Sequence, residues 1–309
     1  MQLNNIHKNR PLVSIIIPTY NRNNTLERAI KSAIGQTYQD FEIIIIDDAS
    51  TESPEELVAS FKDSRIKLFC HESNKGANAA RNTGIKLSSG KYIAFLDSDD
   101  EWFPEKLECQ IKHLEKLPVK VGAHYSGLIV VSSEGVVLGR RIPSASGDIL
   151  SKLFAGNCIG PLSTLMVRRS ALDHAGPFDE QLPSSQDWDF CIRIAQYYHF
   201  SFTKKLLTRY HLSSDSITKN FMSKALGRRM IINKYESQMR KNCSAFSRQL
   251  IKTGHYFCKE GLINNGRREF LRAIRAYPLS LLAYFYFFCS LFGPQKYNQL
   301  VFLRHRLFS

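Results

Sequence analysis

Three carboxylates stand close together after an apolar run in the stretch YIAFLDSDDEW, residues 92–102. Asp97, Asp99 and Asp100 repel one another when ionised, so a bare cluster costs stability. Asp97 and Asp99 supply the oxygen ligands that Mg²⁺ or Mn²⁺ prefers, and such an ion shares its remaining positions with phosphates and water. Ordinary solvated turns contain the same spacing. The position directly after an apolar, strand-like run favours a metal site.

Two other polar clusters follow apolar runs earlier in the chain. VSIII precedes PTYN at residues 18–21, and FEIIII precedes DDAS at residues 47–50. Four consecutive isoleucines fit the interior of a parallel sheet that is covered on both faces. Helical patterns separate the apolar runs, at residues 24–36, 53–61 and 78–90.

The first 100 residues therefore predict the order β-α-β-α-β-α-β, with a short third strand at residues 66–71. This order is typical of an α/β fold with a doubly wound, mostly parallel sheet and helices on both faces. Ligands of such sheets bind beyond the carboxyl ends of the strands. The three polar clusters are therefore expected to meet at one edge of the sheet.

The remaining elements are expected in a simple order. They are a helix at 105–117, a hairpin at 124–141, a strand and short helix at 163–176, a helix at 184–198, a polar loop at 209–218 and a helical region from 221 onward. Asp187 lies in the first turn of the fourth of these elements, where an acidic residue is favoured by the helix dipole.

Taken together, the motifs resemble the family 2 glycosyltransferases with the GT-A fold. The matching segments are VSIIIPTYNR, FEIIIIDDAS, ARNTGI, YIAFLDSDDEW and QDWDFCIR, which lie between residues 12 and 216. The resemblance implies a GT-A catalytic domain at 1–218, with a nucleotide-binding half at 11–103 and an acceptor half at 104–218. The Q-x-x-R-W motif and membrane helices of processive relatives are missing, so a non-processive hexosyltransferase (EC 2.4) that transfers one sugar is expected.

The resemblance also implies a nucleotide site. Its expected residues are Thr19, Tyr20 and Asn21 against the base, Asp48 bonded to the base, Arg81 near the nucleotide and Asp97 at the ribose. Asp47 is interpreted as a turn cap, and an arginine on an ordinary helix face is the alternative for Arg81. UDP is the nucleotide expected for the family, while dTDP and GDP fit the same motifs.

The metal and the catalytic base are implied in the same way. Asp99 matches the ligand of Mn²⁺ or Mg²⁺, and His211 matches a metal or diphosphate contact, although an ordinary loop histidine is the alternative. Asp187 matches the general base, which takes the proton of the attacking hydroxyl in an inverting transfer. Gln186 replaces the glutamate that usually precedes this base, and Asp189 would fit the role of a helix N-terminal acid equally well.

The net charge of +14 belongs to the last third of the chain. Residues 219–309 hold 17 of the 42 Lys and Arg but only three of the 28 Asp and Glu. Within this basic helical region, Phe270, Leu271, Ile274 and Tyr277 recur at helical spacing, with Arg268, Arg272 and Arg275 between them. A basic amphipathic helix suits an anionic membrane surface. The alternative is that these helices pack on the catalytic domain and their arginines are solvated.

The expected location is cytoplasmic, peripheral on the inner face of the cytoplasmic membrane. No signal-peptide pattern is visible, and the seven cysteines show no C-x-x-C pair, as in reduced proteins. The longest apolar run, residues 281–292, is shorter than the ~20 residues that span a bilayer. A lipid-linked saccharide, used in bacterial surface polysaccharide synthesis, is the expected acceptor.

Two other functions compete with this interpretation. The basic region could bind nucleic acid, but no nucleic-acid motif is present and the aromatic residues gather in one apolar run, so no nucleic-acid partner is expected. A metal-dependent nucleotidyltransferase would need a glycine-rich loop after the first strand, and PTYNRNNT has no glycine. An inactive relative is disfavoured because Asp99 and Asp187 are both in place.

Overall fold

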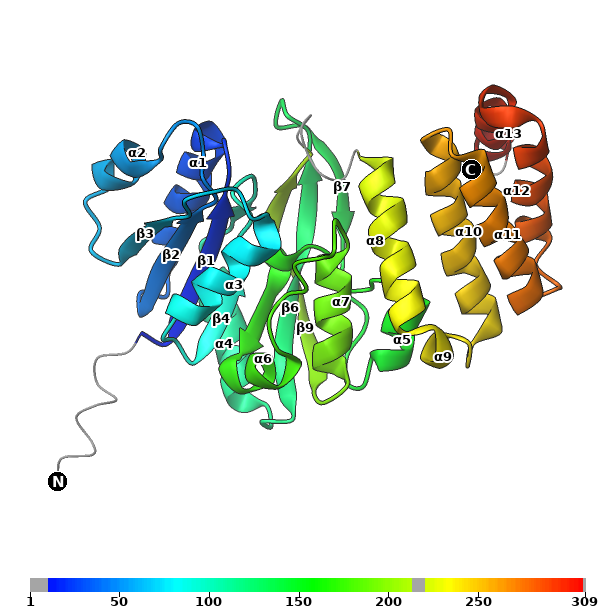
Figure 1. Cartoon of the computed structure of the whole chain (residues 1–309). Coiled ribbons are helices and arrows are strands. Elements are labelled where there is room, and N and C mark those ends of the chain that lie inside the picture. Colours follow the sequence, from blue (N-terminus) through cyan, green and yellow to red (C-terminus); the bar gives the residue numbers. More distant parts are fainter. Residues whose placement is uncertain (1–10, 213–219, 308–309) are drawn as a thin grey trace. The chain divides into compact units, whose positions relative to one another are not determined.

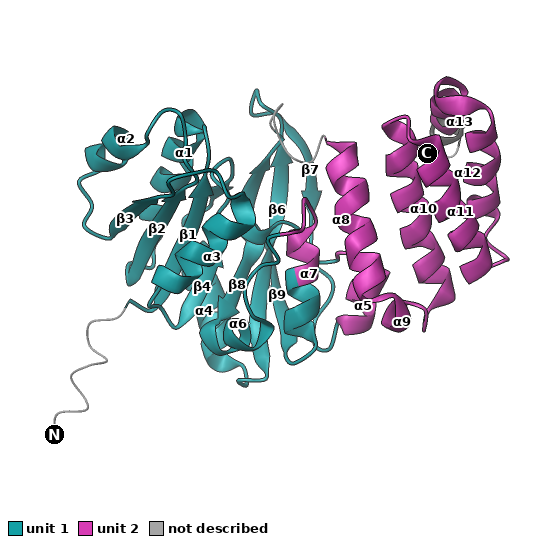
Figure 2. Ribbon diagram, in the orientation of Figure 1, with its two compact units in different colours: residues 1–149, 158–180, 190–214 teal, residues 150–157, 181–189, 215–309 magenta. Residues whose placement is uncertain are grey.

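The computed structural model describes residues 11–212 and 220–307, the last four without their side chains. Two compact units make up the chain (Figure 2). Unit 1 comprises residues 1–149, 158–180 and 190–214. Unit 2 comprises residues 150–157, 181–189 and 215–309. Each unit is described by itself below.

Unit 1 is built on a nine-stranded mixed sheet in the order β3-β2-β1-β4-β8-β6-β9-β5, with β7 paired to β6 (Figure 1). The strands are β1 (Val13–Thr19), β2 (Phe41–Asp47), β3 (Ile66–Cys70), β4 (Tyr92–Phe95), β5 (Glu101–Trp102), β6 (Val121–Val131), β7 (Val137–Arg141), β8 (Leu165–Arg168) and β9 (His199–His211). Strands β1 to β4 are parallel. Beyond β4 the sheet is mixed, because β8 runs antiparallel to both β4 and β6.

Helices cover both faces of this sheet, as the isoleucine run predicts. The helices of unit 1 are α1 (Asn23–Ile34), α2 (Glu55–Ser60), α3 (Ala77–Leu87), α4 (Lys106–Lys116), α6 (Arg169–Ala175) and most of α7 (Gln186–Ala195), with a 3₁₀ turn η1 (Leu162–Thr164). Ile15 and Ile17 share a core with side chains of α1 and α4. Ile44 and Ile46 pack with Ala80 of α3 on the opposite face. Both central strands are therefore buried on two sides.

Helix α3 lies unusually close to the sheet, and one glycine permits this. A Cβ atom on Gly84 would come within 2.5 Å of Cγ2 of Ile16, which is closer than real carbon contacts. The close approach holds the N-terminal half of α3 beside the carboxyl ends of the strands. Arg81, which lies one turn before Gly84, is thereby brought to the same edge as Asp97.

The second half of unit 1 contains one predicted hairpin and one strand that the sequence did not reveal. The hairpin is confirmed as β6 and β7, and the strand followed by a short helix is confirmed as β8 and α6. Strand β9 has two exposed lysines in its middle and shifts in register against β6, so it lacks a clear alternating pattern. The prediction that His211 lies in a loop is wrong, because it is the last residue of β9.

Unit 2 is helical, as predicted for the basic region. It contains α5 (Leu150–Ala155), the first turn of α7, α8 (Phe221–Lys234), α9 (Glu236–Met239), α10 (Cys243–Lys259), α11 (Ile263–Ala276), α12 (Leu281–Leu291) and α13 (Gly293–Leu307). Helices α10 and α11 pack very closely. A Cβ atom on Gly266 would lie 2.8 Å from the carbonyl oxygen of Gly254 and 2.2 Å from Sγ of Cys258, so only glycine fits there.

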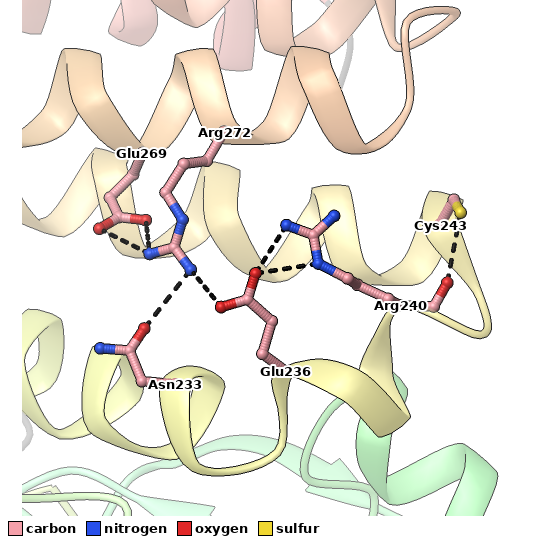
Figure 3. Close-up of polar contacts among 6 residues, drawn as sticks. All are labelled: Asn233, Glu236, Arg240, Cys243, Glu269 and Arg272. Atoms are coloured by element: carbon pink, nitrogen blue, oxygen red, sulfur yellow. Dashed lines mark hydrogen bonds and ion pairs between the residues drawn. The ribbon is translucent and has the colours of Figure 1, made fainter.

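This close packing corrects the expectation of a lipid-facing stripe on α11. Phe270 is fully buried and packs against Tyr286 and Tyr297 inside the helical unit, while Leu271 is exposed. Arg272 is also engaged, because its Nη2 donates to Oε2 of Glu236 at 3.1 Å and its Nη1 to Oε2 of Glu269 at 3.1 Å (Figure 3). The predicted stripe is therefore split between the interior and the surface of unit 2.

In the part of the chain that is described, no helix combines the length and the apolar character needed to cross a membrane. None of the seven cysteines, all of which lie in described segments, forms a disulfide.

Candidate functional site

The three polar clusters meet at one edge of the sheet of unit 1. Thr19 ends β1, Asp48 follows β2, and Asp97 follows β4 after one residue. These three strands are neighbours and parallel, so their carboxyl ends coincide. The amide of Asp48 donates to the carbonyl oxygen of Thr19 at 2.9 Å, and Arg22 forms an ion pair with Asp99. The edge therefore gathers the residues that the sequence picks out for a nucleotide.

The loop after β1 is held rigidly and exposes one aromatic ring. Asn21 adopts a φ of 50°, a left-handed conformation that asparagine tolerates better than most residues. Its Oδ1 accepts from the amide of Thr51 at 2.8 Å, and its own amide donates to Oγ of Ser50 at 2.7 Å. Tyr20 remains 44% exposed, so its ring is accessible for stacking on a planar ligand. Oγ1 of Thr19 is buried without a hydrogen-bond partner in the described residues.

Asp48 is buried and fully engaged by the chain itself. Its Oδ1 accepts from the amide of Lys75 at 2.9 Å and lies 2.7 Å from Nδ1 of His71. Its Oδ2 accepts from the amide of Gly76 at 2.7 Å. The carboxylate therefore fixes residues 71–76 ahead of α3. A contact between Asp48 and a base stays a prediction, whereas Asp47 caps the turn at Ser50 as interpreted.

Replacing Asp48 with alanine is expected to lower the free energy of unfolding of unit 1 by about 3 kcal/mol, because two amides and an imidazole lose a buried acceptor. Urea denaturation measures this. Glu52→Ala is the matched control, since Glu52 is an exposed acid on the neighbouring loop. Equal stability of the two variants would show that the Asp48 carboxylate does not hold this loop.

Positive side chains partly neutralise the carboxylate cluster. Nη2 of Arg81 donates to Oδ1 of Asp97 at 2.6 Å, and the side chain of Arg81 is only 5% exposed. Arg22 pairs with Oδ2 of Asp99, and Nη2 of Arg28 donates to the carbonyl oxygen of Asp99 at 2.6 Å. The planar, multidentate guanidinium of arginine is well suited to hold both a carboxylate and a phosphate oxygen.

Asp100 and Trp102 have structural roles. Asp100 is fully buried, accepts from Oγ of Ser163 and from the amide of His211, and has its pKa raised well above the ordinary value by burial and then by Asp97 and Asp99. Nε1 of Trp102 donates to the carbonyl oxygen of Ser163 at 2.8 Å. Both side chains anchor the loop that carries Asp99.

His211 lies beside this loop, with one ring nitrogen available. Its Nε2 is buried, finds no hydrogen-bond partner among residues 11–212 and 220–307, and lies 3.6 Å from Oε2 of Glu101. Burial, followed by the charge of Arg28, lowers the pKa of His211, so the neutral imidazole is favoured. A neutral imidazole nitrogen beside a carboxylate fits a divalent cation.

The protein supplies few ligands for such a cation. No three His, Cys, Asp or Glu side chains are grouped to hold a metal anywhere in the described ranges. Asp99 and His211 would therefore hold the ion with help from water or a diphosphate, which is how proteins commonly bind Mg²⁺.

Asp187 belongs to unit 2, at the start of α7. Its Oδ2 accepts from Nδ2 of Asn157 at 2.7 Å, and its Oδ1 from the amide of Trp188 at 2.8 Å. Asp189 is fully buried and accepts from Nζ of Lys234 and from the hydroxyl of Tyr235, each at 2.9 Å. The two acids therefore differ, since Asp189 is locked into the interior of unit 2 and Asp187 is half-buried.

Several residues of this edge were missed from the sequence. Arg22 belongs to the quoted PTYNR segment, but its pairing with Asp99, 77 positions away, depends on the sheet. Ser163 and Arg28 come from elements with no polar signature of their own. Only their position relative to the carboxylate loop gives them a role, and a single sequence does not contain that information.

Comparison with known proteins gives one family. The family model described as "Glycosyl transferase family 2" matches residues 14–173. The chain is 36% identical over 212 residues to the UDP-Glc:alpha-D-GlcNAc-diphosphoundecaprenol beta-1,3-glucosyltransferase WfgD of Escherichia coli, covering 68% of this chain and 80% of that protein.

Solved structures agree in fold. TarS residues 1–349 of S. aureus in complex with UDP-GlcNAc align with a TM-score of 0.67 and 18% identity, covering 93% of this chain and 90% of that one. The mannosyltransferase PcManGT of Pyrobaculum calidifontis, in complex with GDP-Man and Mn²⁺, aligns with a TM-score of 0.58 and 17% identity, covering 89% and 78%. At these identities the likeness concerns the fold alone.

Proposed function

Because the chain belongs to glycosyl transferase family 2, we propose that it moves one sugar from a UDP-sugar to a hydroxyl group of a lipid-linked saccharide, with inversion at the anomeric carbon. The family resemblance, the GT-A fold class and the assignment as a transferase are confirmed. The observation that carries the proposal is the meeting of the strand ends of β1, β2 and β4 around Tyr20, Arg81 and Asp99.

The donor and acceptor classes are proposed by analogy with the E. coli relative. The E. coli relative named above uses UDP-Glc as donor and a GlcNAc-diphosphoundecaprenol acceptor. The same classes are proposed here, in bacterial surface polysaccharide synthesis on the inner face of the cytoplasmic membrane.

The donor is proposed to bind at the sheet edge of unit 1. Tyr20, with Thr19 and Asn21, would face the base, and Arg81 with Asp97 would lie at the ribose and its phosphate. Asp99 and His211 would hold Mn²⁺ or Mg²⁺, which when bound stabilises the charge that builds on the departing diphosphate. Arg22 pairs with Asp99 and so offsets the repulsion within the carboxylate cluster.

Asp187 is proposed as the general base. The carboxylate would take the proton from the acceptor hydroxyl as that oxygen attacks the anomeric carbon, and one base suffices for this reaction. Asn157 holds Oδ2 of Asp187 in a fixed orientation, which leaves less freedom for the carboxylate to lose when the acceptor binds. Asp189 does not suit the role, because its carboxylate is buried and accepts hydrogen bonds from Lys234 and Tyr235.

Peripheral membrane binding is proposed for the exposed apolar face of α12 instead of α11. Leu281, Phe288 and Phe292 are 83%, 56% and 60% exposed, and their spacing places them on one side of the helix. Leu279, Phe302 and Leu303 are exposed nearby in the chain. Aromatic and leucine side chains next to a strongly basic region suit the interface of an anionic bilayer.

Replacing Phe288 and Phe292 together with aspartate is expected to weaken binding to vesicles of anionic phospholipid at least about tenfold, because each buried aromatic ring contributes ~2 kcal/mol. Cosedimentation measures this. Val119→Asp is the control, since Val119 is 67% exposed in unit 1. Unchanged sedimentation of the double variant would exclude α12 as the membrane contact.

A transfer assay tests the proposed function. The purified chain is incubated with Mn²⁺ and UDP-glucose, UDP-GlcNAc, dTDP-glucose or GDP-mannose, together with a synthetic GlcNAc-diphospho-lipid. One added sugar from a UDP donor is the expected product. Absence of transfer from every donor to this acceptor, with the chain folded, would contradict the proposal.

A further inference from the structure

Helix α8 carries two cations that form no ion pair within the described residues. Lys224 and Arg228 lie one turn apart on the same side of this helix, and neither forms an ion pair with a carboxylate in the described part of the chain. Lys224 is half-buried, and its Nζ lies 5.1 Å from the centroid of the Phe221 ring and 5.5 Å from that of Tyr256. Arg228 is only 8% exposed.

Neutral groups hold Arg228 in a fixed position. Its guanidinium carbon lies 4.9 Å from the centroid of the Trp188 ring. Its Nη2 donates to Oε1 of Gln249, and Nε2 of Gln249 donates in turn to the carbonyl oxygen of Ala155. Nε of Arg228 is buried without a partner in the described residues. A buried guanidinium that makes no ion pair is costly, so an anion bound beside it would be stabilising.

Two arginines of unit 2, Arg240 and Arg272, are paired with glutamates, in contrast to Arg228. Figure 3 shows that Glu236 accepts hydrogen bonds from both Arg240 and Arg272, and that Glu269 accepts from Arg272. Burial raises the pKa of Glu269, and Arg272 opposes that rise. These are two of the three acids in residues 219–309. Glu236 and Glu269 are thus committed to Arg240 and Arg272, and neither pairs with Lys224 or Arg228.

The two cations lie near the proposed base. Burial lowers the pKa of Arg228, and the nearby Tyr256 hydroxyl and Asp187 carboxylate oppose this change. Trp188, on which Arg228 stacks, is the residue after Asp187. Within unit 2, Asp187, Arg228, Tyr256 and Lys224 therefore form one neighbourhood that is positively charged overall.

We propose that Lys224 and Arg228 bind the diphosphate group of the lipid-linked acceptor. This inference rests on the proposed function, and it adds the place where the acceptor is recognised. A rigid guanidinium and a flexible ammonium one helical turn apart match two successive phosphates. Binding the diphosphate here would bring the attached sugar to the side of unit 2 that carries Asp187.

The test compares two acceptors, GlcNAc-diphospho-lipid with a short chain and an alkyl glycoside of GlcNAc without phosphate. Lys224→Ala is expected to raise KM for the first acceptor roughly 10- to 100-fold, the value of hydrogen bonds to a charged group, and to leave KM for the second unchanged. Lys224→Arg should restore most of the loss. Arg228→Lys is expected to act in the same direction. Lys241→Ala, an exposed lysine of the same unit, is the matched control.

Three results would overturn the inference. The first is an equal effect of Lys224→Ala on both acceptors. The second is a rise in KM for the UDP-sugar alone, which would assign the cations to the donor diphosphate. The third is loss of binding to anionic vesicles with an unchanged KM for the short-chain acceptor, which would assign them to lipid headgroups.

Failure of the proposed function itself would be recognised separately. If the wild-type chain transfers sugar to neither acceptor, calorimetric titration of inorganic diphosphate in EDTA tests the subsite directly. Affinity is then expected to fall at least about tenfold in Lys224→Ala and to stay unchanged in Lys241→Ala. Equal affinity of all three proteins would overturn the inference.

Discussion

Replacing Asp187 with asparagine is expected to lower kcat about 10²- to 10⁴-fold, the usual contribution of a general base. The amide is isosteric with the carboxylate, and its oxygen can still accept from the amide of Trp188 at the start of α7. It has no negative charge and cannot take the proton of the acceptor hydroxyl. Affinity for the donor nucleotide should stay within about twofold, since its proposed site lies in unit 1.

The neighbouring acid provides the matched control. Asp189→Asn removes a buried charge that Lys234 and Tyr235 contact, so it is expected to lower the melting temperature while folded protein keeps turnover within a few-fold. Steady-state kinetics with the diphosphate acceptor and thermal denaturation separate the two variants. Wild-type turnover in Asp187→Asn would show that another group takes the proton.

Replacing Asp99 with alanine is expected to abolish the metal dependence of nucleotide binding. Loss of supporting groups around a metal typically costs 10- to 100-fold in affinity, and loss of a direct ligand should cost at least about 100-fold. The variant should bind UDP with the same weak affinity in Mn²⁺ and in EDTA. It also leaves Arg22 without its carboxylate partner.

Calorimetry of UDP binding measures this difference. Asp173→Ala is the control, because Asp173 is an exposed acid on α6 of the same unit. If Asp99→Ala kept tight, EDTA-sensitive binding of UDP, the ion would have to be held by other residues, and the role of the D-x-D pair would be limited to the loop itself.

The first half of unit 1 was predictable because its strands are buried on both faces. Strands β1 and β2 contain three and four consecutive isoleucines, and such runs are typical of strands covered on both faces. Their parallel order then dictates that the polar residues at their ends converge. Candidate residues from separate motifs could therefore be expected at one edge before the structure was known.

Strand β9 and the packing of α11 could not be predicted from the sequence. In β9 the burial pattern is irregular, since the strand pairs with β6 through several shifts in register. In α11 the apolar pattern is that of a surface helix, and only the contact with α10 at Gly254 and Gly266 decides that Phe270 turns inward. Both outcomes depend on a partner element distant in sequence.

At the candidate site, too, residue types could be predicted from the sequence but burial could not. Asp97, Asp99 and Asp100 were singled out as one cluster, but their separate roles depend on burial. Asp100 is interior with a raised pKa, whereas Asp99 is 17% exposed and paired with Arg22. Asp187 and Asp189 were equivalent by residue type, and the contacts of Lys234 and Tyr235 distinguish them. Which acid remains available for chemistry is a property of packing.

The most direct measurement of the central claim is the structure of the reaction product. The wild-type chain is incubated with Mn²⁺, the UDP-sugar that supports transfer and the GlcNAc-diphospho-lipid, and the product is analysed by mass spectrometry and proton NMR. We expect one added sugar residue, whose anomeric proton signal shows a β linkage formed from an α-linked donor. A product with an α linkage, a chain of several sugars, or a nucleotidyl group in place of the sugar would contradict this expectation.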